Sequence, residues 1–205
     1  MISFVYFDVG GVVIKDFSGT NKWYELKHDL GLTATQIPEA DKIWKNHKAE
    51  INTGHVDLNI LLDVWKKELP LTVPEGYSML NDFVNRFEQN PSIWPALTTI
   101  QQTCGIGLLT NMYIGMFDKI VQRNLLPPVQ WDVIVDSSVV KMKKPDREIF
   151  EYAEKQLHTP HTEILFVDNQ MENITAANDF GWQTFFYDSK NPEDSSQKLL
   201  QLFKK

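Results

Sequence analysis

The chain has 205 residues, a formal net charge of −7 and 42% hydrophobic residues, among them 12 Phe and 6 Trp. This length suits one α/β domain, with or without a smaller inserted module, and the apolar content suffices for a sizeable core. The acidic balance and the lack of a basic run argue against a nucleic-acid partner.

The cysteine count and the distribution of apolar residues indicate the cellular compartment in which we expect the protein. A single cysteine, Cys104, excludes an internal disulfide and a cysteine zinc site, and it agrees with a reducing environment. The first apolar run is short, is broken by Asp8 and follows no basic segment, so we expect no signal peptide. No apolar stretch approaches the ~20 residues of a membrane span. We therefore expect a cytoplasmic protein, monomeric or weakly dimeric, without a membrane partner.

The chain begins with an apolar run of strand length, Ile2 to Phe7, which ends at Asp8 and is followed by Gly10 and Gly11. The carboxyl end of a strand is where an open α/β sheet binds ligands. An aspartate at that point can act as a nucleophile or hold a metal. The two glycines allow a close approach of the backbone to a ligand.

Helical segments follow this strand. Their apolar residues recur at a spacing near 3.6 rather than 2. Thr33 and Asp57 are the predicted N-caps of the second and third segments. The four predicted helices cover residues 20–31, 34–50, 57–69 and 75–88.

From residue 91 onward, strands and helices alternate, which predicts βαβ units and a parallel sheet. The predicted strands cover residues 105–110, 131–135, 163–167 and 182–187, and the predicted helices cover residues 96–103, 113–124, 146–157, 171–180 and 193–203. The helical block interrupts this alternation. We therefore predict an α/β fold with a Rossmann-like parallel-sheet core from residues 1–16 and 91–205 and an inserted all-α domain from residues 17–90.

Polar residues stand at the ends of predicted strands and before one helix. In a parallel sheet these strand ends share one edge. Together they supply a carboxylate nucleophile, a hydroxyl, an amide, a cation and further oxygen ligands, a set that suits a phosphoryl group neutralised by lysine and Mg²⁺. Each residue alone also fits a turn or a helix cap, so their order in the chain carries the argument. The residues are Asp8, Thr110, Asn111, Lys144, Asp168 and Asn169.

These motifs resemble those of the haloacid dehalogenase (HAD) superfamily, in the branch with a helical cap inserted after the first strand. The resemblance covers nearly the whole chain, although the cap is matched only by its length and helical character. It extends to sugar-phosphate phosphatases of this branch, such as glucose-1-phosphate phosphatases. The matching segments are residues 7–12, 108–111, 144–150 and 166–174, with Ala177 and Gly181.

The resemblance implies a role for each motif. Asp8 would attack phosphorus and form an aspartyl-phosphate, and Lys144 would neutralise Asp8 and the phosphate. Thr110 and Asn111 would hold phosphate oxygens. The remaining implied groups are the backbone of Gly10 and Gly11 at the phosphate, and a Mg²⁺ ion held by Asp8, the carbonyl of Gly10, Asp168 and Asn169.

Two departures from the family pattern put catalysis in question. Relatives that are phosphatases carry a proton-transferring Asp two residues after the nucleophile, where this chain has Gly10. Loss of such a group typically costs about 10²–10⁴-fold in rate. Asn169 stands where the relatives usually have an acidic metal ligand, and Asp168 or Glu172 are the candidates to compensate.

Three functions stay open at this stage. The first is a Mg²⁺-dependent phosphatase of a small phosphorylated metabolite, with the proton coming from water, the substrate, or a cap histidine, His47 or His55. The second is a metal-independent 2-haloacid dehalogenase, which needs no second Asp, although Gly10-Gly11 and Asp168-Asn169 differ from the dehalogenase motifs. The third is a catalytically impaired module that binds a phosphorylated ligand or a protein.

The cap offers two further hypotheses. Residues 50–55 form either a substrate-facing loop or an ordinary turn between helices with Gly54 as the C-cap. Trp23, Trp44 and Trp65 are expected to form the core of the cap rather than a stacking platform.

Overall fold

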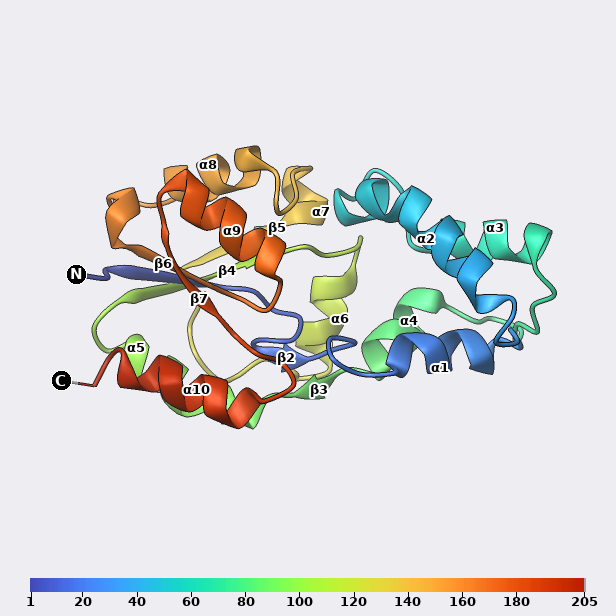
Figure 1. The fold of residues 1–205 in the computed structure, drawn as a ribbon, viewed down its shortest axis with the longest axis horizontal. Coiled ribbons are helices and arrows are strands. Elements are labelled where there is room, and N and C mark those ends of the chain that lie inside the picture. Colours follow the sequence, from blue (N-terminus) through green and yellow to red (C-terminus); the bar gives the residue numbers. More distant parts are fainter. Residues whose placement is uncertain (205) are drawn as a thin grey trace.

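A five-stranded parallel sheet forms the centre of the larger part of the molecule (Figure 1). The computed structural model describes residues 1–204, and Lys205, the last residue of the predicted core, lies outside them. The strands are β1 (Phe4–Phe7), β4 (Gly105–Thr110), β5 (Val133–Asp136), β6 (Ile164–Asp168) and β7 (Gln183–Phe186), in the order β5-β4-β1-β6-β7. The α/β prediction with a parallel sheet is therefore confirmed.

Helices cover both faces of this sheet because its central strands are apolar on both sides. Tyr6 stacks on Trp182 at a ring-centroid distance of 5.6 Å, on the face that α8 and α9 cover. Phe7 points to the opposite face, where α5 and α10 pack against each other (Figure 1). The helices of this part are α5 (Trp94–Ile100), α6 (Met116–Gln122), α7 (Ser137–Val140), α8 (Arg147–Lys155), α9 (Met171–Phe180) and α10 (Pro192–Gln201).

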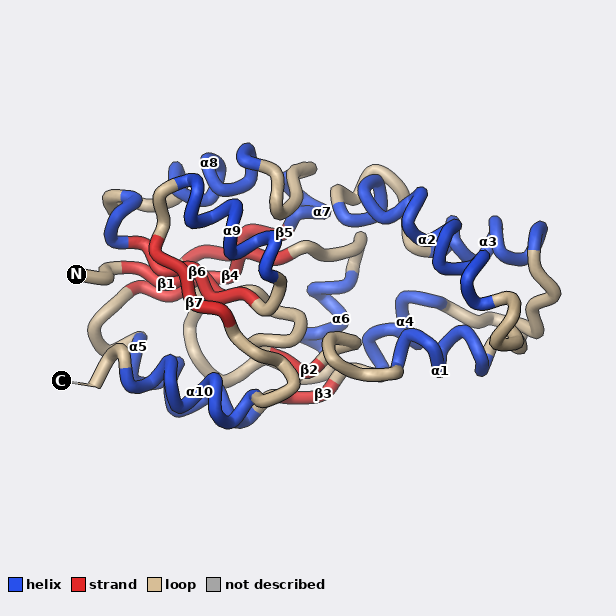
Figure 2. The backbone as a smooth tube through the Cα atoms, viewed as in Figure 1, coloured by secondary structure: helices blue, strands red, loops and turns tan. Residues whose placement is uncertain are grey.

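The inserted helices form the cap, a second part of the molecule at the end opposite both termini (Figures 1 and 2). The predicted N-cap Asp57 lies one residue before the observed N-cap, Leu58, although its Oδ1 accepts the backbone N–H of Asn59 at 2.7 Å. The prediction for Thr33 is wrong: residues 34–36 form a turn, and the helix begins only at Ile37. The cap helices are α1 (Lys22–Asp29), α2 (Ile37–Asn52), α3 (Asn59–Glu68) and α4 (Met79–Asn85).

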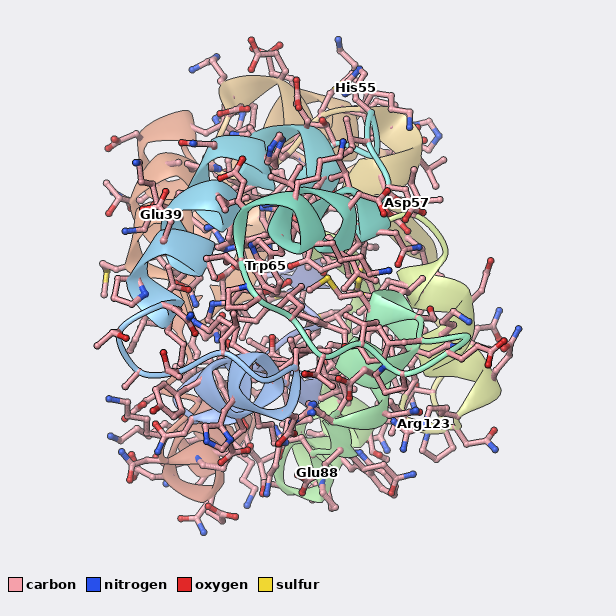
Figure 3. All side chains as sticks on the ribbon, turned by 90° about the vertical axis from the view of Figure 1, so that its right-hand side faces the viewer. Glu39, His55, Asp57, Trp65, Glu88 and Arg123 are labelled. Carbon is pink, nitrogen blue, oxygen red and sulfur yellow. The ribbon has the colours of Figure 1, made fainter. Side chains whose placement is uncertain are left out.

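Aromatic side chains fill the interior of the cap. Trp65 is fully buried and lies amid the cap helices in Figure 3. Its ring centroid is 5.9 Å from that of Trp23, which in turn lies 5.6 Å from Trp44. The expectation that these tryptophans pack in the cap core is therefore confirmed, although Trp23 and Trp44 are only partly buried.

The two connections between the sheet and the cap pair with each other. β2 (Ile14–Lys15) and β3 (Glu88–Gln89) form a short antiparallel ribbon. Sequence patterning missed both, because two residues show no periodicity, and the last predicted cap helix ends earlier, at Asn85. The domain boundaries at 16/17 and 90/91 stay a prediction.

A second contact joins the cap to the sheet side. The Lys141 Nζ donates to the carbonyl of Gly54 at 2.6 Å, and the Ser137 hydroxyl donates to the carbonyl of Asn52. These bonds hold the carboxyl end of α2 against α7, which the sequence analysis did not predict.

Across residues 1–204, each helix is too short or too polar to cross a bilayer.

Candidate active site

The predicted site residues gather at the carboxyl edge of the sheet. Asp8 follows the central strand β1, while Thr110 and Asp168 end the neighbouring strands β4 and β6. The backbone N–H of Asp8 continues the strand pairing, because it donates to the carbonyl of Val167 at 2.8 Å. A cavity of about 240 Å³ opens there, facing α2 of the cap. Its lining includes Asp8, Gly10, Thr110, Asn111, Lys144 and Asn169.

A buried lysine joins two of the carboxylates. The Nζ of Lys144 lies 2.9 Å from Asp8 Oδ1 and 2.6 Å from Asp168 Oδ2, and its side chain is 1% exposed. Burial by itself would lower the pKa of Lys144, but the charges of Asp168 and Asp8 outweigh it and hold this pKa above its ordinary value. The lysine is therefore a fixed cation at the floor of the cavity, not the solvated lysine that its place before Pro145 would also allow.

Asp168 serves mainly to hold this lysine. Its Oδ2 also accepts Asn173 Nδ2 at 3.0 Å, and its Oδ1 accepts the backbone N–H of Gln170 at 2.7 Å. Both oxygens are thus engaged, and Asp168 is absent from the cavity lining. Its carboxylate positions Lys144, and direct ligation of a metal by Asp168 stays a prediction.

Thr110 and Asn111 differ in what they offer to a ligand. The Thr110 hydroxyl is buried and finds no hydrogen-bond partner among residues 1–204. Asn111 instead grips the backbone of Lys144, donating to its carbonyl and accepting its N–H, each at 2.9 Å. Asn111 still lines the cavity with one amide N–H uncommitted, but its first task is to place the lysine.

The two glycines after the nucleophile have separate roles. Gly10 lines the cavity, whereas Gly11 donates its N–H to the carbonyl of Ile14 at 2.8 Å. This hydrogen bond engages the amide of Gly11 within the chain, and the contact of Gly11 with phosphate stays a prediction. Gly11 adopts φ +78°, and a Cβ at this position would collide with the side-chain amide of Asn169. Glycine is therefore required here for the turn and for the approach of Asn169.

The candidate metal ligands include a neutral amide where a carboxylate was expected, but their oxygen atoms are of the kind that binds Mg²⁺. Both side-chain polar atoms of Asn169 are buried without a hydrogen-bond partner in the described part of the chain. Asp8 Oδ1 accepts the N–H of Val9 and contacts Lys144, which leaves Oδ2 for another partner. Carboxylate, carbonyl and amide oxygens are the ligands that Mg²⁺ prefers. Asp8, the carbonyl of Gly10 and Asn169 thus fit a magnesium ion, although no group of three or more His, Cys, Asp or Glu residues within 1–204 could hold a metal.

Several residues of the cavity were missed by sequence analysis. Lys48 is one of them and lies on α2, one turn before Asn52; Asn52 itself belongs to the segment 50–55 that was predicted as a possible substrate-facing loop. Asp16, Ser18 and Tyr113 also line the cavity. Their positions depend on loops after β1 and β4, which give no periodic signal.

Asp16 is the least expected of these groups. Burial raises its pKa to about 6, and the nearby charge of Asp8 adds to the effect, while hydrogen bonds from Ser18 oppose it. The backbone N–H of Ser18 donates to Asp16 Oδ1 at 2.8 Å. The cavity therefore contains a second carboxylate near the nucleophile. It belongs to Asp16 and not to position 10, where the chain has a glycine.

The two cap histidines stand apart from this cavity. His55 is exposed at the periphery of the cap (Figure 3), where its Nδ1 lies 2.7 Å from the Thr53 hydroxyl. His47 faces Glu50, and neither histidine belongs to the cavity lining. Of the segment 50–55, only Asn52 lines the cavity, and Gly54 adopts φ +62° directly after the helix C-cap.

Comparison with known proteins settles the family. A family model described as haloacid dehalogenase-like hydrolase matches residues 2–181. The chain belongs to this family. An enzyme of the HAD family from Bacteroides thetaiotaomicron has the same fold, with a TM-score of 0.79, 16% identity, and coverage of 100% of this chain and 99% of the other. An L-2-haloacid dehalogenase shares the fold with a TM-score of 0.66 and 18% identity over 91% of this chain and 84% of its own.

Curated relatives match this HAD-like hydrolase over part of their own length. The sesquiterpene phosphatase astK of Aspergillus oryzae is 40% identical over 83 residues, which make up 39% of this chain and 40% of that protein. The matched parts make up 13% of the drimenol cyclase drtB of Aspergillus calidoustus and 19% of the mouse acyl-CoA dehydrogenase family member 10. The chain thus spans well under two thirds of the length of these relatives.

Proposed function

We propose that this HAD-like hydrolase is a Mg²⁺-dependent phosphatase that cleaves small phosphorylated metabolites through an aspartyl-phosphate on Asp8. The observation that carries the proposal is the contact of 2.9 Å between the Asp8 carboxylate and the buried Lys144, beside the unpartnered hydroxyl of Thr110. An anionic nucleophile attacks an anionic phosphate only where fixed positive charge and hydrogen-bond donors compensate the repulsion. Lys144 and Thr110 supply both at the same edge of the sheet.

The chain's own residues divide the work of the first step. An Asp8 oxygen attacks phosphorus in line with the leaving oxygen, while the Thr110 hydroxyl donates to a phosphate oxygen. Lys144 offsets the charge that Asp8 and the phosphate bring together, and Asp168 and Asn111 keep the lysine in place. This preorganisation needs no rearrangement of the floor of the cavity.

Magnesium would be held by Asp8, the carbonyl of Gly10 and Asn169. When bound, the ion supplies positive charge that stabilises the phosphate in the transition state. A HAD-family enzyme from Bacteroides thetaiotaomicron, whose structure was obtained in complex with magnesium and inorganic phosphate, supports the metal, and the relative named a sesquiterpene phosphatase supports the phosphatase activity.

The cavity favours a compact, polar substrate such as a sugar phosphate. Its volume of about 240 Å³ is below the ~300–1,000 Å³ of ordinary small-molecule pockets. Lys48 and Asn52 extend into it from α2, where they can contact the group that carries the phosphate. A long isoprenoid chain would need the cap to move away from the sheet.

A panel of phosphate esters, with and without Mg²⁺, tests the proposal. It should include sugar phosphates, other alkyl phosphates and an isoprenyl phosphate, with Asp8→Asn as the control. We expect Mg²⁺-dependent phosphate release from at least one compact ester by the wild type and none by Asp8→Asn. Metal-independent halide release from 2-halo acids would favour the dehalogenase instead, and ligand binding without turnover would favour the binding module.

A further inference from the structure

Position 10 lacks the carboxylate expected of a phosphatase of this family, and the side chain of Asp16 lies where that carboxylate would begin. If position 10 carried a Cβ, that atom would lie 2.5 Å from Asp16 Oδ2 and 3.2 Å from Asp16 Cγ. A contact below 3.0 Å is one that real Cβ atoms essentially never make. The Asp16 carboxylate thus occupies the volume that a side chain at position 10 would enter, within the cavity that holds Asp8.

The local backbone explains how Asp16 reaches this place. After Asp8 the chain turns back through residues 9–13, with the N–H of Ile14 donating to the carbonyl of Val9 at 3.0 Å. An isolated bridge links Gly10 to Ile14, and β2 then carries the chain on to Asp16. The Ser18 N–H donates to Oδ1 of Asp16. The other oxygen, Oδ2, is the one that lies nearest to Gly10.

We propose that Asp16 is the general acid and base of this enzyme, in the place of the absent carboxylate at position 10. The proposal rests on the proposed phosphatase function. As Asp8 attacks and the bond from phosphorus to the leaving oxygen breaks, the Asp16 carboxyl gives its proton to that oxygen, and the alcohol leaves. The Asp16 carboxylate then takes a proton from water, the water oxygen attacks the phosphorus of the aspartyl-phosphate, and phosphate and the Asp8 carboxylate are released.

The other proton-carrying groups fit this task less well. His47 and His55 do not line the cavity within the described chain. Burial raises the pKa of the Tyr113 phenol far above neutrality, so Tyr113 cannot alternate between its two forms at physiological pH. Glu172 enters the cavity from α9, the helix that follows Asn169, and is exposed. Asp16 alone stands where a side chain at position 10 would be.

Substitution of Asp16 by Asn keeps the shape of the side chain and removes its proton transfer. For an alkyl phosphate, whose leaving group needs a proton, we expect kcat/KM to fall by about 10²–10⁴-fold. For 4-nitrophenyl phosphate, whose leaving group needs none, the first step should survive. Asp16→Asn should then release a rapid burst of one nitrophenolate per enzyme, followed by slow turnover as the aspartyl-phosphate accumulates.

The matched control is Glu88→Gln, which removes a carboxylate from β3, the strand that pairs with β2 just before Asp16. Glu88 is exposed at the periphery of the molecule (Figure 3), where it pairs with Lys22 at 2.7 Å. This variant should behave as the wild type with both esters. A merely structural role of Asp16 would lower the turnover of both esters equally without a burst, and that result would overturn the proposal.

An exchange of the two positions provides the second test. Gly10→Asp should lose activity, because its side chain meets Asp16, whereas the double variant Gly10→Asp/Asp16→Gly should recover turnover of the alkyl ester relative to Asp16→Asn. Higher turnover of Gly10→Asp than of wild type would overturn the proposal, as would wild-type behaviour of Asp16→Asn. If wild-type turnover depends on Asp8 but not on Asp16, only the role of Asp16 fails; if the wild type hydrolyses no ester, the phosphatase function itself fails.

Discussion

The Nζ of Lys144 lies 2.9 Å from the Oδ1 of Asp8, at a depth where the lysine side chain is 1% exposed. A contact of this kind is strong because water does not screen it, and it is costly to break because each partner would be left buried with its charge uncompensated. The contact therefore holds the nucleophile in place before any substrate arrives.

Lys144→Met tests this relationship. Removal of the ammonium group leaves Asp168 fully buried without its cation, so we expect the free energy of unfolding to fall by about 3–5 kcal/mol. We also expect phosphatase kcat to drop by at least about 10²-fold, because charge stabilisation at the phosphate is lost. Thermal denaturation and phosphate release measure the two effects. Lys143→Met is the control, since Lys143 pairs with Asp146 and lies outside the cavity; equal losses in both variants would contradict the assignment.

Thr110→Val separates stability from function. The Thr110 hydroxyl is buried with no partner within residues 1–204, and an unsatisfied hydroxyl costs about 1–3 kcal/mol. Its replacement by a methyl group of similar shape should leave the melting temperature unchanged or raise it. Catalysis should fall, because a donor to the phosphate is removed, while Thr110→Ser should retain most activity. A lower melting temperature with unchanged kinetics would show that the hydroxyl has a structural role.

Gly11→Ala should damage the metal site through Asn169. Gly11 has φ +78°, and an added Cβ would collide with the Asn169 amide. Gly76 has φ +69° with nothing within 4 Å of an added Cβ, so Gly76→Ala isolates the backbone cost, about 1 kcal/mol. We expect Gly11→Ala to lose more stability than this control and to require more Mg²⁺ for half-maximal activity. Equal effects of the two substitutions would argue against a role for the contact with Asn169.

Asn169→Asp should strengthen magnesium binding. It adds a second carboxylate to a set of ligands in which Asp8 supplies the one carboxylate that we assign, so the Mg²⁺ concentration for half-maximal activity should fall. The metal should also raise the melting temperature more in this variant than in the wild type, because a ligand that binds the native state stabilises it more at a given concentration when its dissociation constant is lower. Chelation of Mg²⁺ should abolish activity in both. An unchanged Mg²⁺ requirement would place the metal elsewhere.

The sequence was sufficient to bring together Asp8, Thr110 and Asp168, because strand ends of a parallel sheet share one edge whatever the loops do, and Lys144 was placed beside them by its motif before a helix. It could not predict that Asp168 holds the lysine or that the amide of Gly11 is engaged, since hydrogen bonds between side chains and backbone leave no periodic trace. The sequence pattern indicates a strand end at Asp8 but gives no signal for the return of the chain through residues 9–13.

Asp16 shows this limit most clearly. It stands eight positions after the nucleophile in the chain. An irregular turn followed by a strand of two residues brings it close to Gly10. The cap residues Lys48 and Asn52 could be placed on one face of a helix, but their position over the cavity depends on how α2 is held against α7. Tertiary contacts between separate parts of the chain decide both cases.

In the proposed mechanism the phosphoryl group passes from the substrate to Asp8 and forms an aspartyl-phosphate. Asp16→Asn, with 4-nitrophenyl phosphate and Mg²⁺, should accumulate this species, and borohydride reduction of the acid-quenched protein would convert it into homoserine. Peptide mass spectrometry should then find homoserine at position 8 and nowhere else, and none in Asp8→Asn. Nitrophenolate release with an unmodified Asp8, or with the phosphoryl group on another residue, would contradict the account.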